Sequence, residues 1–268
     1  MTSWELLAIG AILLLGVPHG GLDGAVARRI GWPPGLVSWL GFHLAYAILA
    51  ALTAVLWWLF PLAGLGVFLL ISALHFGGSD IASVGTDSLP WIAHGGLVPI
   101  VIPSLQPALV EPIFVILVGA ENASLLLNGL ISLFLPWLLI LIVYCFYAFK
   151  QLQYRRSLVS LLGFVGLAIV LPPLVSFAVY FCFWHSRGHM LRLWQSLGIN
   201  ERRRSVVEAA MYTVVSWLTA GLIFYYFQTP STAALVKLTF IGLAALTLPH
   251  MLLVDYADRK YHLREELP

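Results

Sequence analysis

Long hydrophobic runs separated by short polar stretches dominate the pattern of this sequence. The runs from Leu36 to Phe60 and from Leu125 to Phe149 contain no Lys, Arg, Asp or Glu. A helix needs about 20 apolar residues to cross a hydrocarbon core of about 30 Å, whereas the strands of a membrane barrel alternate in polarity over about 10 residues. The pattern therefore predicts an all-α fold, a polytopic bundle of transmembrane helices.

The hydrophobic runs predict eight or nine spans. Their ranges are 3–18, 36–60, 62–76, 91–118, 125–149, 158–171, 174–194, 206–228 and 234–256. The number is left open because the runs 62–76 and 158–171 are short. The run 91–118 holds four prolines, and because proline removes a helix hydrogen bond, we expect a broken or re-entrant helix there. The pair Pro172-Pro173 separates the two spans that flank it.

The composition agrees with membrane insertion and excludes a soluble enzyme. Hydrophobic residues make up 60% of the 268 residues and charged residues only 10%, against about 25% charged residues in soluble domains. The net charge of +2 is too small to indicate nucleic-acid binding. The two cysteines, Cys145 and Cys182, lie inside apolar runs and predict no disulfide framework. No repeat or polar linker divides the chain, so we expect a single integral membrane domain over residues 1–268.

The basic residues predict the orientation of the chain in the cell membrane. Lys and Arg cluster in short stretches at 28–29, 150–156, 202–204 and 259–264. Cytoplasmic loops carry the excess of Lys and Arg, and nine alternating spans place all of these clusters on one side. We therefore expect a multi-pass protein with a cytoplasmic C-terminus. The first run lacks a basic start and a small-residue cleavage site, so we expect it to stay as a span.

The eight histidines are the most unusual polar feature of this membrane sequence. All except His262 fall towards the predicted cytoplasmic ends of spans. Ionisable residues inside a membrane are costly, which makes each one a functional candidate. His185 and His189 are four residues apart, so both rings lie on one helix face. Such a pair suits two metal ligands, although one histidine in a membrane also serves as a hydrogen-bond donor between helices.

Two of the histidines precede aspartates in glycine-containing motifs. His19 lies in Val-Pro-His-Gly-Gly-Leu-Asp, which ends at Asp23, and His75 begins His-Phe-Gly-Gly-Ser-Asp, which ends at Asp80. Imidazoles that bind a metal usually pass their second N–H to a carboxylate or a carbonyl. Asp23 and Asp80 are therefore candidates for supporting a metal site.

A site made of histidines alone is compatible with iron, copper, nickel or zinc. The sequence His-Ser-Arg-Gly-His at 185–189 lacks the Glu of a zinc protease, and no Cys-x-x-Cys-His motif for covalent haem is present. An open coordination position in apolar surroundings suits oxygen chemistry on an apolar substrate. Two other functions stay open at this point: a membrane electron carrier with bis-histidine haem, and a non-enzymatic transporter of metal ions or protons.

Four motifs together resemble the Brp/Blh family of bacterial and archaeal membrane enzymes. They are Val17 to Asp23, His75 to Asp80, Phe183 to His189 and Leu248 to Met251. The resemblance covers essentially the whole chain. It implies a β-carotene 15,15'-dioxygenase, which splits the central double bond of β-carotene with O₂ to give two molecules of all-trans-retinal. It also implies a functional link to a microbial rhodopsin.

The resemblance further implies an Fe(2+) cofactor, and it maps the iron ligands of the family onto His19, His75, His185 and His189. We expect a second group of residues to lie in the pocket or behind these ligands: Asp23, Asp80, His94, His250, Tyr180 and Trp184. The last two belong to an aromatic run at 177–184. Aromatic residues in such a run either line a substrate tunnel or pack between helices.

Overall fold

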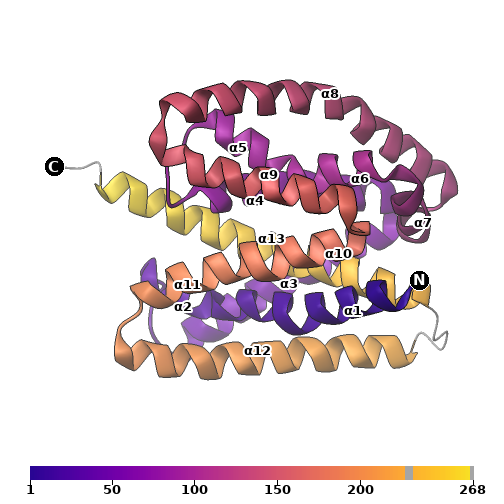
Figure 1. The fold of residues 1–268 in the computed structure, drawn as a ribbon. Coiled ribbons are helices and arrows are strands. Elements are labelled where there is room, and N and C mark those ends of the chain that lie inside the picture. The colour runs from indigo at the N-terminus through magenta and orange to yellow at the C-terminus, as the bar shows by residue number, and fades with distance from the viewer. Residues whose placement is uncertain (227–231, 266–268) are drawn as a thin grey trace. The chain divides into compact units, whose positions relative to one another are not determined.

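The fold is helical throughout the part of the chain that the structure describes (Figure 1). The structure is a computed structural model that describes residues 1–226 and 232–265, with the backbone alone at 259 and 261–265. The predicted all-α fold is confirmed. The side chains of Arg259, His262 and Arg264, which entered the sequence predictions, lie outside the described residues.

Several helices are suited to crossing a membrane, as predicted for a multi-pass protein. Among the described residues, seven helices are long and apolar enough: Ser3–Arg29, Leu36–Leu59, Pro61–Ile81, Ser88–Leu105, Ala120–Lys150, Ile199–Tyr226 and Thr232–Asp258. The helix Pro107–Val118 is apolar but only 12 residues long. The total of eight or nine spans therefore stays a prediction.

The chain divides into two compact units, each built from segments that are distant in sequence. The first unit comprises Met1–Ile12 and Phe60–Gly188, and the second comprises Leu13–Leu59 and His189–Pro268. The first unit combines the N-terminal residues with the middle of the chain, and the second combines residues 13–59 with the C-terminal part. The prediction of a single domain over residues 1–268 stays a prediction.

The first unit is a bundle in which two long helices, α4 and α8, contact most of the others. Its helices are α1 (Ser3–Ala11), α4 (Pro61–Ile81), α5 (Ser88–Gly95), α6 (Ile102–Leu105), α7 (Pro107–Val118), α8 (Ala120–Lys150), α9 (Arg155–Val170) and α10 (Pro173–Ala178). Helix α4 packs along α5, and α8 packs along both α5 and α7. The contact of α4 with α5 depends on Gly95, because a side chain there would collide with the carbonyl oxygen of Ala73.

Prolines interrupt the helices of the first unit where the sequence predicted. The run 91–118 is broken at Gln106, whose φ of −135° and ψ of 56° end α6 before Pro107 begins α7. Leu171 and Pro172 separate α9 from α10. Both breaks fall immediately before a proline, because proline disfavours the helical conformation in the residue that precedes it.

The second unit surrounds a short turn that carries His19. Its helices are α2 (Asp23–Arg29), α3 (Leu36–Leu59), α12 (Ile199–Tyr226) and α13 (Thr232–Glu265), with most of α11 (Arg187–Ser196). Helix α3 packs along α13, and the 3₁₀ turn Val17–Leu22 packs on α12. Gly21 permits this contact, because a Cβ atom there would lie 2.9 Å from the Cα atom of Ala209.

Three stretches of π-helix occur among the described residues, each next to or around a histidine. They are Ile12–Gly16 before His19, Leu97–Val101 after His94, and Val179–Ser186 around His185. A π-helical stretch shifts the side chains that follow it to another face of the helix. Such stretches are frequent at functional sites. The sequence pattern gave no sign of these turns.

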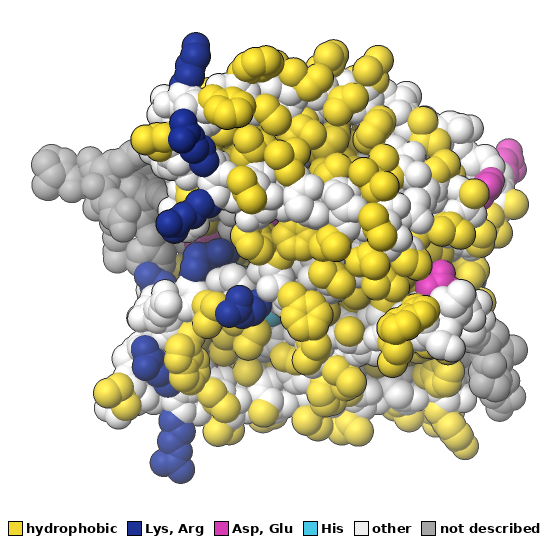
Figure 2. Space-filling view, viewed as in Figure 1, with side chains coloured by type: hydrophobic (Ala, Val, Ile, Leu, Met, Phe, Trp, Pro, Cys, Tyr) yellow, Lys and Arg dark blue, Asp and Glu magenta, His cyan; other side chains and the backbone are white. Residues whose placement is uncertain are grey.

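Hydrophobic side chains cover most of the face shown in Figure 2. The exposed fraction reaches 85% for Val37, 79% for Trp58 and 78% for Val170. Contiguous apolar surface of this kind is rare on soluble monomers. It is the expected exterior of a multi-pass membrane protein, whose helices are surrounded by lipid.

Candidate metal centre

Two predicted ligands lie together in the first unit. His75 is on α4 and His185 is in the π-helical stretch Val179–Ser186. Their ring centroids are 5.1 Å apart with the rings nearly perpendicular, and each residue is only 2% exposed. The ring of Phe76 packs edge to face on His185 at 4.6 Å, so this pair of imidazoles is enclosed by apolar groups.

Asp80 connects this pair to two further residues of the predicted set. Its carboxylate accepts a hydrogen bond from the hydroxyl of Tyr180 at 2.7 Å and contacts Nδ1 of His185 at 3.3 Å. Nδ1 of His94 lies 3.8 Å from the same carboxylate. Because a carboxylate accepts hydrogen bonds, it selects the tautomer of His185 that carries its proton on Nδ1. Asp80 thus contacts His185, another residue of the predicted set, and its role beside a metal stays a prediction.

His94 is held from its other side as well. Its Nε2 atom is 2.7 Å from the hydroxyl of Ser157 on α9, and the residue is 2% exposed. Both ring nitrogens therefore face protein groups, one at Asp80 and one at Ser157. The role of His94 in the pocket or behind the ligands stays a prediction.

Three histidines meet in the second unit. The ring centroid of His250 is 4.9 Å from that of His19 and 5.3 Å from that of His189, and His19 and His189 are 6.1 Å apart. The rings are close to perpendicular in each pair, and all three residues are buried. His19 comes from the 3₁₀ turn, His189 from α11 and His250 from α13.

In the second unit, the carboxylate of Asp23 bonds to His250. Asp23 accepts a hydrogen bond from Nδ1 of His250 at 2.7 Å and one from the hydroxyl of Tyr46 at 2.9 Å. Asp23 follows His19 by four residues. The chain forms a 3₁₀ turn there, in which Nδ1 of His19 contacts the carbonyl oxygen of Gly16, and the role of Asp23 beside a metal stays a prediction.

The predicted set of residues is thus found in two groups. The first unit brings His75 to His185, and the second brings His19 to His189 with His250 between them in ring contact. Within the described residues, no group of three or more His, Cys, Asp and Glu side chains is arranged to hold a metal ion. The four-histidine ligand set stays a prediction.

One residue of the predicted pocket has other surroundings, and one residue near the site was not predicted. Trp184 packs edge to face on Phe164 at 5.5 Å, and in the described contacts it meets this ring rather than a histidine. Tyr46 was not among the residues predicted for the site. Its role as the donor to Asp23 follows from the packing of α3 along α13, which no local pattern encodes.

A third contact between aspartate and tyrosine lies outside the membrane-spanning helices. Asp87, in the loop before α5, accepts a hydrogen bond from the hydroxyl of Tyr147 at 2.5 Å. This bond, with a second from Tyr154, holds the pKa of Asp87 below its ordinary value. Burial and the hydrogen bond to Asp87 raise the pKa of Tyr154. This contact therefore differs from those of Asp80 and Asp23, because no histidine takes part in it among the described residues.

Comparison with known proteins identifies similar sequences along nearly the whole chain. The profile of the β-carotene 15,15'-dioxygenase family matches residues 10–258. A β-carotene 15,15'-dioxygenase from uncultured marine bacterium 66A03 is 34% identical, with 98% of this chain and 97% of the relative aligned. A probable β-carotene 15,15'-dioxygenase Blh from Halobacterium salinarum is 25% identical over 94% of this chain and 83% of the relative. No solved structure is significantly similar to the chain.

Proposed function

The chain belongs to the β-carotene 15,15'-dioxygenase family and cleaves β-carotene to retinal, and we propose that it does so on an iron(II) ion held by four histidines. The proposed ligands are His19, His75, His185 and His189. The family match supports the reaction, and the two buried histidine groups support the ligands. The carboxylate behind His185 is the observation that carries the metal assignment, because imidazoles that bind a metal usually have such a partner.

The donor chemistry of these histidines fits a ferrous ion. Nδ1 of His185 faces the carboxylate of Asp80 at 3.3 Å, and Nδ1 of His19 faces the carbonyl oxygen of Gly16. Both partners only accept hydrogen bonds, so Nδ1 carries the proton in each ring and Nε2 becomes the nitrogen that can bind a metal. Neutral imidazoles are suitable ligands for iron.

The surrounding residues orient the imidazoles and keep water away. Phe181 stacks on His185 with an angle of 11° between the rings, and Phe76 covers another side of it. Tyr180 donates to the carboxylate oxygen of Asp80 that is not turned to His185, which fixes the carboxylate. In such dry surroundings each hydrogen bond is stronger than in water, so the orientation of His185 is well defined.

Bound iron(II) would supply the one-electron chemistry that allows O₂ to react with a closed-shell polyene. The overall reaction needs no reductant, because both atoms of one O₂ enter the products. The central carbon–carbon double bond is broken, and each of its carbons becomes the carbonyl carbon of one retinal. The residues described above need to hold an apolar substrate next to the histidines and exclude water from them.

The proposal includes the orientation of the chain. In the second unit, Nη1 of Arg28 donates to Glu208 at 2.6 Å, and Nζ of Lys260 donates to the carbonyl oxygen of Ile30 at 2.6 Å. These contacts gather basic residues from α2 and α13 near one another, as expected for a cytoplasmic end. A reporter fused after Pro268 should therefore read cytoplasmic, and a periplasmic signal would contradict the orientation.

Expression in cells that make β-carotene tests the function directly. We expect the cells to lose their orange colour and to accumulate retinal, and the purified protein to contain iron. Removing the iron with a chelator should stop retinal formation, and adding Fe(2+) should restore it. Retinal formation by metal-free protein would contradict the iron centre, and iron with a haem Soret band would contradict the histidine-only site. The link to a microbial rhodopsin follows from the product, since such proteins bind retinal.

A further inference from the structure

The second unit contains two apolar grooves of nearly equal size. The first, here called the α3–α13 groove, has a volume of about 560 Å³ and is lined by residues of those two helices and of the loop at 30–33. The second, the α11–α12 groove, has a volume of about 590 Å³ and is lined by residues of those helices and of the turn with His19. The two grooves share no lining residue.

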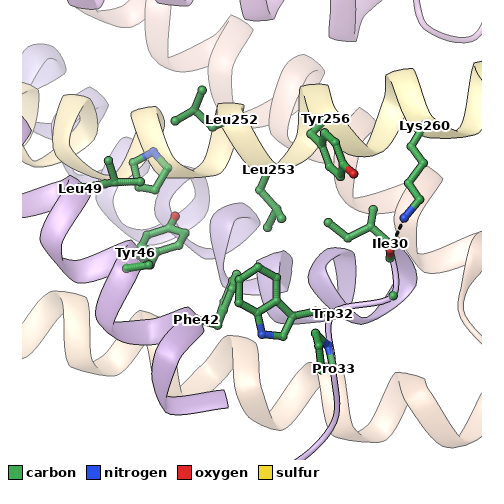
Figure 3. A pocket seen from close by; sticks show the side chains of 13 residues that line it. Ile30, Trp32, Pro33, Phe42, Tyr46, Leu49, Leu252, Leu253, Tyr256 and Lys260 are labelled. Carbon is green, nitrogen blue, oxygen red and sulfur yellow. Dashed lines mark hydrogen bonds between the residues drawn. The ribbon is translucent and has the colours of Figure 1, made fainter. Parts of the chain in front are cut away.

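The α3–α13 groove has aromatic walls. Figure 3 shows Phe42 and Tyr46 of α3 on one side and Leu253 and Tyr256 of α13 on the other. Trp32 packs edge to face on Phe42 at 5.5 Å, and its indole N–H donates to the carbonyl oxygen of Ser38 at 3.1 Å. Aromatic side chains in fixed positions offer the flat apolar contacts that a conjugated chain requires.

The α11–α12 groove is built in the same way from different helices. Leu191 and Trp194 come from α11, and Val206 and Trp217 come from α12. The indole N–H of Trp217 donates to the carbonyl oxygen of Leu13 at 2.9 Å. Each groove therefore holds a tryptophan whose ring is tied to the backbone, and each has apolar side walls.

Each groove is lined by residues that are adjacent in sequence to histidines of the second unit. The α3–α13 groove is lined by Pro249, the neighbour of His250, and by Tyr46, whose hydroxyl bonds to Asp23. The α11–α12 groove is lined by Pro18, the neighbour of His19, and by Met190, the neighbour of His189. The two grooves thus have lining residues next to different members of the same histidine group.

The substrate has two equal halves joined at the bond that is cleaved. We propose that each groove receives one half of the β-carotene molecule, from the central double bond to one terminal ring; this inference rests on the proposed histidine centre. Both volumes fall within the range of about 300–1,000 Å³ that is usual for ligand pockets. The linings are open to the outside, with exposed fractions of 56% for Tyr256 and 48% for Val214, so a substrate dissolved in lipid can enter.

Filling either groove tests the proposal. Ala45 on α3 and Ala210 on α12 line the two grooves and are exposed, so Ala45→Phe and Ala210→Phe add a ring to a groove without disturbing a packed core. The matched controls are Ala47→Phe on α3 and Val207→Phe on α12, which are exposed positions outside the grooves. We expect both groove variants to lose about 10–200-fold in kcat/KM for β-carotene, the usual effect of a misfit in an apolar pocket, and the controls to keep the wild-type value.

A carotenoid shortened at one end makes the test specific. Its short arm needs less of one groove, so each Phe variant should cleave it with a kcat/KM near that of the wild type. The iron content of all variants should equal that of the wild type, because the substitutions lie away from the proposed ligands.

Three results have distinct meanings. Unchanged kcat/KM in both groove variants would show that the grooves hold only lipid and would overturn the proposal. A loss in one variant alone would overturn the assignment of two halves to two grooves. Wild-type protein that forms retinal without iron would instead contradict the proposed function, whatever the groove variants do.

Discussion

The two units contain similar combinations of aspartate, tyrosine and histidine, yet they use the aspartate differently. In the first unit, Asp80 bonds to Tyr180 and contacts His185, a proposed iron ligand. In the second, Asp23 bonds to Tyr46 and to His250, which is not among the proposed ligands. The same three residue types are therefore found beside a proposed metal ligand in one unit and beside a groove proposed to hold substrate in the other.

The difference follows from where each carboxylate lies along the chain. Asp80 is at the end of α4, one turn beyond His75, and meets a histidine from a π-helical stretch. Asp23 begins α2 directly after a 3₁₀ turn. In this turn His19, the histidine nearest in sequence, contacts a backbone carbonyl oxygen. Asp23 is thereby left to bond with α3 and α13, the helices that form a groove.

The largest effect is expected at a ligand that has a supporting carboxylate. Replacing His185 with Ala removes a metal–nitrogen bond and leaves Asp80 without its imidazole. We expect His185→Ala to lose both its iron and its retinal formation, measured by metal analysis and by product analysis of the same preparation. His262→Ala is the control, since this residue lies in the polar tail of the sequence, and it should match the wild type in both. Full activity in His19→Ala or His75→Ala would contradict the four-histidine site.

His250 gives the sharpest test of the comparison between the units. If the ligands are the four proposed histidines, His250→Ala keeps most of its iron. Its activity should nevertheless fall towards the upper end of the 10–100-fold range known for residues that support a metal site, because Asp23, which also bonds to Tyr46, loses its imidazole partner. The iron content of purified His250→Ala, measured together with that of His185→Ala, shows whether His250 is a ligand. Equal iron loss in both variants would make His250 a ligand and the two units alike.

The helices could be predicted from the sequence, and their irregular parts could not. Hydrophobic runs predicted most of the long apolar helices, and prolines predicted the breaks at Gln106 and at 171–172. Helix α12 begins at Ile199 rather than at 206, because its first turns carry Arg202 to Arg204 and are not apolar. Helices that continue beyond the lipid keep their backbone hydrogen bonds but lose the hydropathy signal.

The candidate residues could be named from the sequence, but their pairing could not. Intramembrane histidines and aspartates are conspicuous because they are costly. The bond between Asp23 and His250 joins residues separated by 227 positions, and it depends on how α13 packs on α2 and α3. Local spacing shows only that Asp23 follows His19 by four residues. The 3₁₀ turn at Val17–Leu22 rotates side chains differently from an α-helix.

Replacing the two aspartates separates their roles. Asparagine keeps one acceptor oxygen and removes the charge, so Asp80→Asn and Asp23→Asn should each lose about tenfold in activity, the lower end of the range for supporting residues. Asp80→Asn should hold iron more weakly than Asp23→Asn when challenged with a chelator, because Asp80 contacts the proposed ligand His185 whereas Asp23 bonds to His250. Weaker iron binding in Asp23→Asn would show that Asp23 also supports a ligand through His250.

Asp87 provides the smallest expected effect and a reference for both carboxylates. It has tyrosine partners like the other two, but it lies in a loop and contacts no histidine in the described residues. Its pKa in the folded protein is below the ordinary value, so its contribution to stability is complete above that ordinary value, about 4, and is lost as the pH falls through the lower folded value. Asp87→Asn should therefore leave retinal formation and iron content at neutral pH unchanged, and it should reduce the loss of thermal stability between neutral pH and about pH 3.

Melting curves of detergent-solubilised protein across this range would measure the change, with the wild type at each pH as the control. An Asp87→Asn variant with reduced iron content would show that an aspartate–tyrosine contact matters for the metal site without a histidine, and the comparison between the units would lose its basis.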